Sequence, residues 1–165
     1  MKKVWPVPQW QSQFSYKQHP RSFGSKRSQG RTHAGCDLYA PLGSEVLAIS
    51  AGRVVSAGKF YMGTFEVSID HGALGVVRYG EIAVAPGLDL KSNVEAGQVI
   101  GYVASLGRGI PPMLHIEQFK GGRVGPLTDR SNPPYLRRAD LVDITPLLDD
   151  MVCSHLGGIC KVVAA

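Results

Sequence analysis

The feature of this sequence that most restricts its fold is a series of short apolar runs, separated by turns that contain glycine, in the part of the chain that follows His33. The runs are short and rich in Val, Ile and Tyr, which is typical of β-strands. They cover residues 46–49, 53–57, 65–69, 76–79, 98–104 and 113–119. Residues 70–72 lie between two runs and predict a hairpin turn. The pattern therefore predicts an all-β fold made mainly of antiparallel strands.

A repeat and a helix start add to this picture. Residues 50–57 resemble residues 95–102, because each has a small residue, a glycine turn and then an apolar strand. Two copies are too few for a solenoid, so the repeat predicts a sheet built from two similar halves. Thr145 followed by Pro146 predicts a short C-terminal helix, with Thr145 as its cap.

The chain length of 165 residues suits one domain with a single core. We expect a basic N-terminal arm over residues 1–30 that wraps on the body, a β core over residues 31–120, and a C-terminal loop, short helix and tail over residues 121–165.

Residues 1–36 carry seven Lys and Arg residues and no acidic residue, in a chain of net charge +5. Such a segment favours a polyanion, which could be nucleic acid, an acidic membrane surface or the bacterial cell envelope, or it is simply a solvated arm. Specific nucleic-acid recognition is not expected, because the sequence has no basic helix and no aromatic ladder.

The sequence also bears on membranes and compartments. No apolar run approaches the roughly 18 residues that span a bilayer, so no membrane span is expected. The first ten residues contain charges and two prolines where a signal peptide needs an apolar stretch. We therefore expect synthesis in the cytoplasm without a recognisable signal peptide, followed by delivery through another system if the substrate lies outside.

Three cysteines allow two interpretations. Cys153 and Cys160 are close in sequence and would close a small loop in an oxidising compartment. In a cytoplasm, three unrelated buried thiols are the alternative.

Two segments carry candidate metal ligands. Alternate side chains of an extended strand share a face, so His33 and Asp37 point the same way, with Gly35 leaving room between them. Cys36 points to the opposite face and is not counted as a ligand. His115 would add a second imidazole from another strand. Three protein ligands with an open fourth position are typical of catalytic zinc, although a lone strand histidine is also commonly a core residue.

Several blocks of the sequence, in a fixed order, resemble the lysostaphin-like (LytM-type) zinc endopeptidases of bacterial cell walls. The blocks are RTHAGCDLYAPLG at 31–43, VLA at 46–48, GRV at 52–54, VSIDHG at 67–72, VEAGQVIG at 94–101 and LHIE at 114–117. The resemblance implies a duplicated hybrid motif: a β-sandwich-like antiparallel sheet with a groove over one Zn²⁺ ion. It also implies hydrolysis of peptide cross-links or stem peptides in peptidoglycan.

On these positions, the resemblance makes His33, Asp37 and His115 the zinc ligands. Two non-ligand histidines of the family are replaced here by Glu81 and Met113. A thioether has no N–H donor, so Met113 cannot replace a histidine chemically. We expect Glu81 to act as the catalytic base; as a fourth zinc ligand it would instead close the site.

Four further residues have predicted places near this site. Met113 is expected to form an apolar wall of the groove. Tyr79 is expected either to line the groove or to pack in the core. Glu117 is expected to orient a ligand imidazole from behind, or else to be a solvated acid at a strand end. His71 is expected to be structural.

The sequence thus favours a zinc endopeptidase acting on bacterial peptidoglycan. Such an enzyme would suit a phage lysin, a phage tail enzyme or a secreted antibacterial effector, acting in the periplasm or cell wall after delivery, with an immunity or delivery protein as a candidate partner. The alternative is a non-catalytic, zinc-stabilised module that binds peptidoglycan or a cell-wall enzyme. A carrier domain with a swinging lysine is excluded, because no lysine lies between methionines at a predicted hairpin tip.

Overall fold

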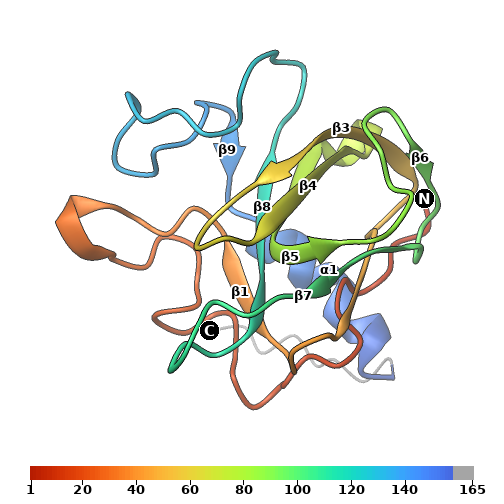
Figure 1. The fold of residues 1–165 in the computed structure, drawn as a ribbon, viewed down its shortest axis with the longest axis horizontal. Coiled ribbons are helices and arrows are strands. Elements are labelled where there is room, and N and C mark those ends of the chain that lie inside the picture. The colour runs from red at the N-terminus through yellow and green to blue at the C-terminus, as the bar shows by residue number, and fades with distance from the viewer. Residues whose placement is uncertain (158–165) are drawn as a thin grey trace.

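The computed structural model describes residues 1–157, and within them nine strands form one connected sheet in which every pair is antiparallel (Figure 1). The strands are β1 (Cys36–Tyr39), β2 (Glu45–Leu47), β3 (Gly52–Lys59), β4 (Phe65–Asp70), β5 (Val76–Val84), β6 (Asn93–Val94), β7 (Val99–Val103), β8 (Met113–Phe119) and β9 (Leu141–Val142). The remaining regular elements of this range are the helix α1 (Thr145–His155) and two 3₁₀ turns, η1 (Ser28–Gly30) and η2 (Gly72–Leu74). The predicted all-β class with a short C-terminal helix is confirmed.

The sheet branches at β5. Its main path runs β1-β8-β5-β4-β3-β6, while β7 joins β5 to β2 and β9 pairs with β8. Residues 76–80 of β5 pair with β8, and residues 82–84 pair with β7. The two repeated segments contribute to β3 and β7, which lie on different branches.

The predicted strands and turn agree closely with the structure. The run 113–119 is β8, and the run 65–69 is β4 without its last residue. His71 and η2 connect β4 to its antiparallel partner β5, as the predicted hairpin requires. The largest difference is that β5 continues to Val84, because the backbone stays paired after the apolar run has ended.

The predicted cap of the C-terminal helix is wrong by one position. Thr145 is the first residue of α1, and Ile144 occupies the N-cap without a side-chain hydrogen bond. The carboxylate of Asp143 instead accepts a hydrogen bond from the Thr145 N–H at 2.8 Å. On its inner face, the helix buries Leu148 and Met151.

Residues 1–30 contain no β-strand and lie along the body. The N–H of Val4 donates to the carbonyl of Ile49 at 2.9 Å, which ties the arm to the sheet. Trp5 and Tyr16 are both 3% exposed and belong to the main hydrophobic core. Aromatic residues therefore anchor this segment.

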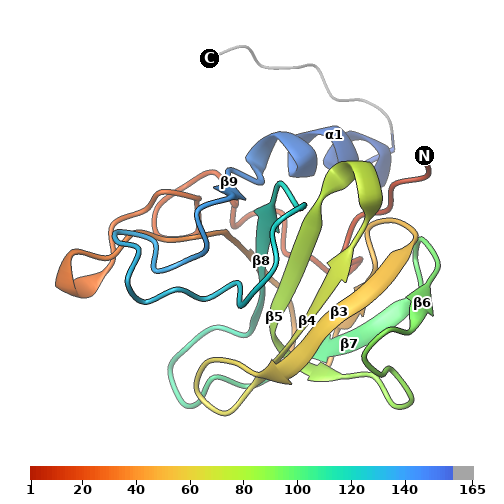
Figure 2. The ribbon, with the colours of Figure 1, turned by 90° about the horizontal axis from the view of Figure 1, so that it is seen from above.

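The loop that follows β8 lies beside the N-terminal arm (Figures 1 and 2). The Thr32 N–H donates to the Pro134 carbonyl at 3.0 Å, and the rings of Phe23 and Tyr135 stack with centroids 5.2 Å apart. The segment before β1 and the loop after β8 therefore meet next to these two strands.

Within residues 1–157, no helix combines the length and the apolar character needed to cross a membrane. Cys36 is fully buried, with its thiol 3.7 Å from Thr145 Oγ1. Cys160 lies outside the described residues, so its bridge to Cys153 stays a prediction.

Candidate metal centre

Two paired strands and the segment before them bring the candidate ligands together. Asp37 of β1 lies directly opposite His115 of β8 in the strand register. His33 precedes β1, where its N–H donates to the carbonyl of Ser25 at 2.8 Å. All three residues are buried, each with 6–7% of its surface exposed.

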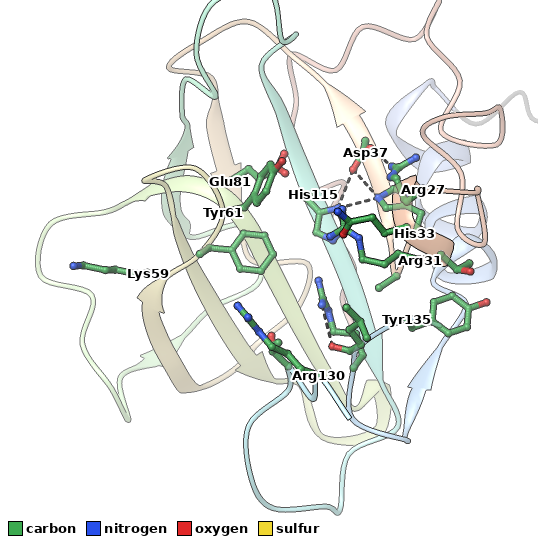
Figure 3. Close-up of a pocket in the computed structure, with 17 residues that line it drawn as sticks. Arg27, Arg31, His33, Asp37, Lys59, Tyr61, Glu81, His115, Arg130 and Tyr135 are labelled. Atoms are coloured by element: carbon green, nitrogen blue, oxygen red, sulfur yellow. Dashed lines mark hydrogen bonds and ion pairs between the residues drawn. The ribbon is translucent and has the colours of Figure 1, made fainter. Parts of the chain in front are cut away.

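The candidate ligand atoms form a small triangle (Figure 3). His33 Nε2 lies 3.0 Å from Asp37 Oδ1 and 3.1 Å from His115 Nδ1, which lies 2.8 Å from the same carboxylate oxygen. Tetrahedral zinc with bonds of about 2.0–2.1 Å holds its ligand atoms about 3.3 Å apart. A slight expansion of the triangle would therefore accommodate a metal ion of this size.

In both candidate histidines, the ring nitrogen outside the triangle has its own hydrogen-bond acceptor, so the other ring nitrogen can face a metal ion. His33 Nδ1 lies 2.9 Å from the Ser22 carbonyl, so it carries the proton and Nε2 holds the lone pair. His115 Nε2 lies 2.8 Å from Glu117 Oε1 and donates to it. Such partners fix the ring orientation and the tautomer of metal-binding histidines. The donor set therefore fits a metal ion.

Two of the three groups, His33 and Asp37, already have the charge that suits a cation. Burial lowers the pKa of His33, which favours the neutral imidazole that binds metal. Burial would raise the pKa of Asp37, but hydrogen bonds from His115 and His33 outweigh it and hold that pKa below its usual range. Burial would lower the pKa of His115, but its hydrogen bonds to Asp37 and Glu117 outweigh burial and raise this pKa to about 10. A metal on His115 Nδ1 would replace the proton that this atom shares with Asp37.

Glu117 lies behind the triangle in a buried ionic network. Its side chain is fully buried, and Oε1 accepts from His115 Nε2 at 2.8 Å and from Arg137 Nη2 at 2.7 Å. Arg78 Nη1 donates to Oε2 at 3.2 Å. Burial would raise the pKa of Glu117, but the His115 bond and the two arginines hold it well below its usual range. Glu117 is thus placed to orient His115, and its burial excludes the solvated-acid alternative.

Arg27, from the N-terminal arm, contacts the other side of the triangle. One of its guanidinium nitrogens lies 3.2 Å from Asp37 Oδ2. This contact neutralises part of the carboxylate charge and leaves Oδ1 to face the two imidazoles.

Glu81 is the extra residue of a β-bulge. In the pairing of β4 with β5, Phe65 lies opposite Ile82 whereas Glu66 lies opposite Gly80, so Glu81 is skipped. It is also the residue at which β5 changes partner from β8 to β7. Its φ of 65° is uncommon for a residue other than glycine. Bulges of this kind turn a side chain to a new direction and are common next to active sites.

The bulge directs Glu81 into the same cavity as the candidate ligands. The residue is 8% exposed, and within the described chain its Oε2 is buried without a hydrogen-bond partner. Burial raises the pKa of Glu81 to about 7, and the nearby His115 opposes this shift. Glu81 does not belong to the three-residue ligand group.

The cavity has a volume of about 750 Å³ and contains both the triangle and Glu81 (Figure 3). Its walls come from the arm, the turn after β3 and the loop after β8. The lining side chains outside the triangle are mostly cationic or aromatic, and they include Arg27, Arg31, Lys59, Phe60, Tyr61, Arg130, Tyr135 and Arg137.

Three predicted positions differ in how they relate to this cavity. Tyr79 is fully buried in the core, where its hydroxyl accepts from the Ile49 N–H at 3.0 Å and contacts His71 Nε2 at 2.9 Å. Of its two predicted places, Tyr79 therefore has the packed one, and His71 is structural. Met113 is buried but is not among the cavity-lining residues, so it does not form the expected apolar wall. It begins β8 opposite Tyr39, beyond the Asp37–His115 pair.

The arginines around the site were not predicted from the sequence. Arg78 had one local signal, because strand alternation places it on the same face of β5 as Gly80, which pairs with His115. Arg27 and Arg137 lie in segments without a period, so only the folded chain shows their carboxylate partners.

Residues 31–126 match the model of peptidase family M23. The match covers more than half of the chain, and it contains all three candidate ligands and Glu81. The chain belongs to peptidase family M23.

Individual relatives agree with this assignment. The chain is 32% identical over 130 residues to the DD-carboxypeptidase/endopeptidase Mpg of Neisseria meningitidis serogroup B, which covers 78% of this chain but only 29% of Mpg. A zinc containing peptidase from Vibrio cholerae superimposes with a TM-score of 0.55 and 27% identity, over 71% of this chain and 36% of that one. The catalytic domain of lysostaphin from Staphylococcus simulans gives a TM-score of 0.58 at 22% identity, over 80% of this chain and 90% of that domain, which shows the shared fold.

Proposed function

We propose that this protein is a zinc-dependent endopeptidase that hydrolyses peptide cross-links or stem peptides of bacterial peptidoglycan. One observation supports it most: the cavity that contains three converging ligand atoms also contains a buried carboxylate oxygen that has no hydrogen-bond partner among residues 1–157. Family membership supports a metallopeptidase, and Mpg is named for peptidase activity. The chain spans 29% of Mpg, so the substrate is part of the proposal.

The donor set fits zinc. Zinc accepts two imidazole nitrogens and one carboxylate oxygen, and three protein ligands leave one position open. His33, Asp37 and His115 would hold the ion. When bound, zinc supplies Lewis-acid chemistry, because it polarises a carbonyl group and makes water more acidic.

The protein groups around that position have distinct roles. Glu117 keeps His115 in the tautomer with a free Nδ1, and Arg27 leaves Asp37 Oδ1 free to bind. Glu81 accepts the proton of the attacking water and passes it to the leaving amine. Two neutral histidines and two carboxylates balance the charge of a divalent ion, so the assembled site is close to neutral.

Replacing Glu81 by Gln tests the role of the base. Glu81→Gln is expected to keep its fold and its zinc but to lose hydrolysis by about 10²-fold or more. Glu95→Gln, at an exposed glutamate before β7, is the matched control and should hydrolyse at the wild-type rate. Hydrolysis by Glu81→Gln at the wild-type rate would show that Glu81 is not the base.

The metal is tested separately. Purified protein is expected to bind about one zinc ion per chain. His33→Ala, Asp37→Ala and His115→Ala should each lose it, by elemental analysis. Undiminished zinc in all three variants would reject the ligand assignment.

The class of bond that the protein hydrolyses is tested on purified peptidoglycan. Cross-linked muropeptides should be shortened in a chelator-sensitive way, while glycan strands without peptide stay intact. Mass analysis of the fragments identifies the bond, and release of reducing sugar ends would identify a glycosidase instead.

A non-catalytic, zinc-stabilised module that binds peptidoglycan is the second candidate. The loss of both non-ligand histidines, at Glu81 and Met113, favours it. It becomes the better description if Glu81→Gln loses zinc, because Glu81 would then be a fourth ligand in a closed site.

We also propose that the protein acts in the periplasm or cell wall, after delivery by a phage or a secretion machine, with an immunity or delivery protein as a partner. Peptidoglycan forms the bacterial cell wall, and this location of the proposed substrate supports the periplasm or cell wall as the compartment. Fractionation of producing and target cells tests it, and protein confined to the producer's cytoplasm would reject it.

A further inference from the structure

We infer that the cavity contains a carboxylate-binding subsite formed by Arg31 and Arg130, which selects peptides that carry a free carboxylate near the bond to be cut. This inference rests on the proposed function, because the same cavity would hold the scissile peptide. It adds the charge of the substrate, which neither the ligand set nor Glu81 specifies.

The cavity has an excess of positive charge. Its acidic lining residues are Asp37 and Glu81, whereas its cationic lining residues are Arg27, Arg31, Lys59, Arg130 and Arg137. A bound zinc ion would add to this excess. A concave site lined by one sign of charge concentrates ligands of the opposite sign.

Two of the five cationic side chains already have carboxylate partners. Arg27 pairs with Asp37 at 3.2 Å, and Arg137 pairs with Glu117 at 2.7 Å. Their charges are largely neutralised within the protein.

The other cations are available to a ligand. Within residues 1–157, no carboxylate oxygen lies within 4.0 Å of the side-chain nitrogens of Arg31, Lys59 or Arg130. The Arg31 side chain makes only long hydrogen bonds to Ser28 in the described chain, at 3.4 and 3.5 Å. Figure 3 shows Lys59 extending away from the other labelled side chains, so we leave it out of the subsite.

Arg31 and Arg130 come from segments that are fixed to each other. Arg31 belongs to the N-terminal arm and Arg130 to the loop after β8, and both line the cavity. The hydrogen bond from the Thr32 N–H to the Pro134 carbonyl at 3.0 Å joins the two segments. The backbones that carry the two arginines are therefore held next to the same cavity.

The chemistry of these groups identifies the ligand. Guanidinium groups match the planar geometry of carboxylates, often with two parallel hydrogen bonds. A cavity of about 750 Å³ suits a ligand of the size of a short peptide rather than a polymer that lies along the surface. Peptidoglycan stem peptides carry free carboxylates, whereas an oligoglycine bridge offers none along its length. The subsite therefore favours stem peptides.

Equilibrium binding tests this without requiring hydrolysis. The ligands are an uncross-linked stem tetrapeptide and the same peptide with its carboxylates converted to carboxamides. Zinc-loaded wild type is expected to bind the acid form about tenfold more tightly at low salt, since two exposed charge pairs each contribute about threefold. The preference should decrease as salt is raised.

Variants assign the preference to the two arginines. Arg31→Gln combined with Arg130→Gln should bind both forms equally, at the affinity of wild type for the amide. Arg53→Gln, at an exposed arginine of β3 outside the cavity, should keep the wild-type preference. Equal binding of both forms by wild type, or a full preference in the double variant, would overturn the subsite.

Two further results separate this inference from others. Glycerol 3-phosphate that displaces the peptide at lower concentration than acetate would identify a phosphate site and overturn the carboxylate assignment. A carboxylate preference in a protein that never hydrolyses muropeptides would support the subsite and reject only the proposed catalysis.

Discussion

At the scale of single residues, Glu117 connects the candidate metal ligands to parts of the chain that the family model does not cover. Its Oε1 accepts from His115 on one side and from Arg137 on the other. Arg137 lies beyond residues 31–126, which match the family. The orientation of a ligand imidazole therefore depends on a loop that follows the conserved fold.

Arg137→Gln should weaken zinc binding. Without the charge of Arg137, Glu117 loses a hydrogen-bond donor and holds His115 less firmly. Losses of this kind reduce metal affinity about 10- to 100-fold. Competition with a chromophoric chelator measures the affinity. Arg138→Gln is the matched control, because this neighbouring arginine pairs with Asp140 at 2.7 Å. Arg137→Lys should restore part of the affinity, and equal zinc binding in all variants would contradict the role.

Glu81 predicts a dependence of stability on pH in metal-free protein. Burial raises the pKa of Glu81 from its usual 4.5 to about 7, so ionisation costs stability as the pH rises through this window. Glu81→Gln removes a cost of up to about 3 kcal/mol. Urea unfolding of chelator-treated protein should therefore show Glu81→Gln gaining stability over wild type at pH 8 but not at pH 4. Glu66→Gln should lose stability, because Ser56 and Ser68 donate to that carboxylate. A Glu81→Gln effect independent of pH would contradict this account.

The sequence predicted the residues that depend on local geometry. Strand alternation indicated that His33 and Asp37 share a face, and the family resemblance added His115 from a second strand as the third ligand. The partners Arg27 and Arg137 could not be found this way, since their positions depend on how unpatterned segments return to the sheet.

At the scale of elements, the approach of the segment before β1 to β8 depends on Gly35. A Cβ atom at Gly35 would lie 2.1 Å from the Ile116 carbonyl oxygen and 3.1 Å from Glu117 Cγ. No side chain fits there unless the two segments separate. The sequence suggested that Gly35 leaves room between the ligands, and the structure shows that it leaves room for the neighbouring backbone.

Gly35→Ala should destabilise the fold and weaken the metal site together. The extra methyl group forces β8 away from the segment that carries His33 and Asp37, at a cost of about 1–3 kcal/mol or more. Thermal unfolding and zinc affinity measure the two effects. Gly58→Ala in β3 is the control, because nothing lies within 4 Å of the added Cβ. Unchanged zinc affinity in Gly35→Ala would show that the spacing of β1 and β8 does not set the site.

The elements that sequence patterns missed are those with too little pattern to detect. β6 and β9 have two residues each, and two residues show no alternation. The extension of β5 was missed because Gly80 and Glu81 interrupt the apolar run exactly where the bulge forms. A bulge of this kind requires a break in the regular pattern, so the position proposed as the catalytic base is also the one that obscures the strand.

At the scale of the whole molecule, the N-terminal arm and α1 hold each other against the sheet. The Trp5 ring lies 5.9 Å from Tyr16 and 5.7 Å from His155, measured between ring centroids. Tyr16 donates to Asp149 at 2.6 Å, and Lys17 pairs with the same carboxylate at 2.7 Å. Part of the positive charge of the arm is therefore neutralised by α1. The sequence had suggested an arm that binds a polyanion or is solvated, and it gave no sign of this internal partner.

Trp5→Ala should loosen the arm and, through it, the metal site. Removing a buried tryptophan costs about 3–5 kcal/mol, and Trp5 is 3% exposed. The arm also supplies the Ser22 carbonyl to His33 and Arg27 to Asp37, so zinc affinity should fall with stability. Trp10→Ala, at a half-buried ring of the same cluster, should have a smaller effect on both. Denaturant unfolding and chelator competition on the same samples test the coupling. Stability lost without any change in zinc affinity would show that the arm stabilises the sheet but does not help to position the ligands.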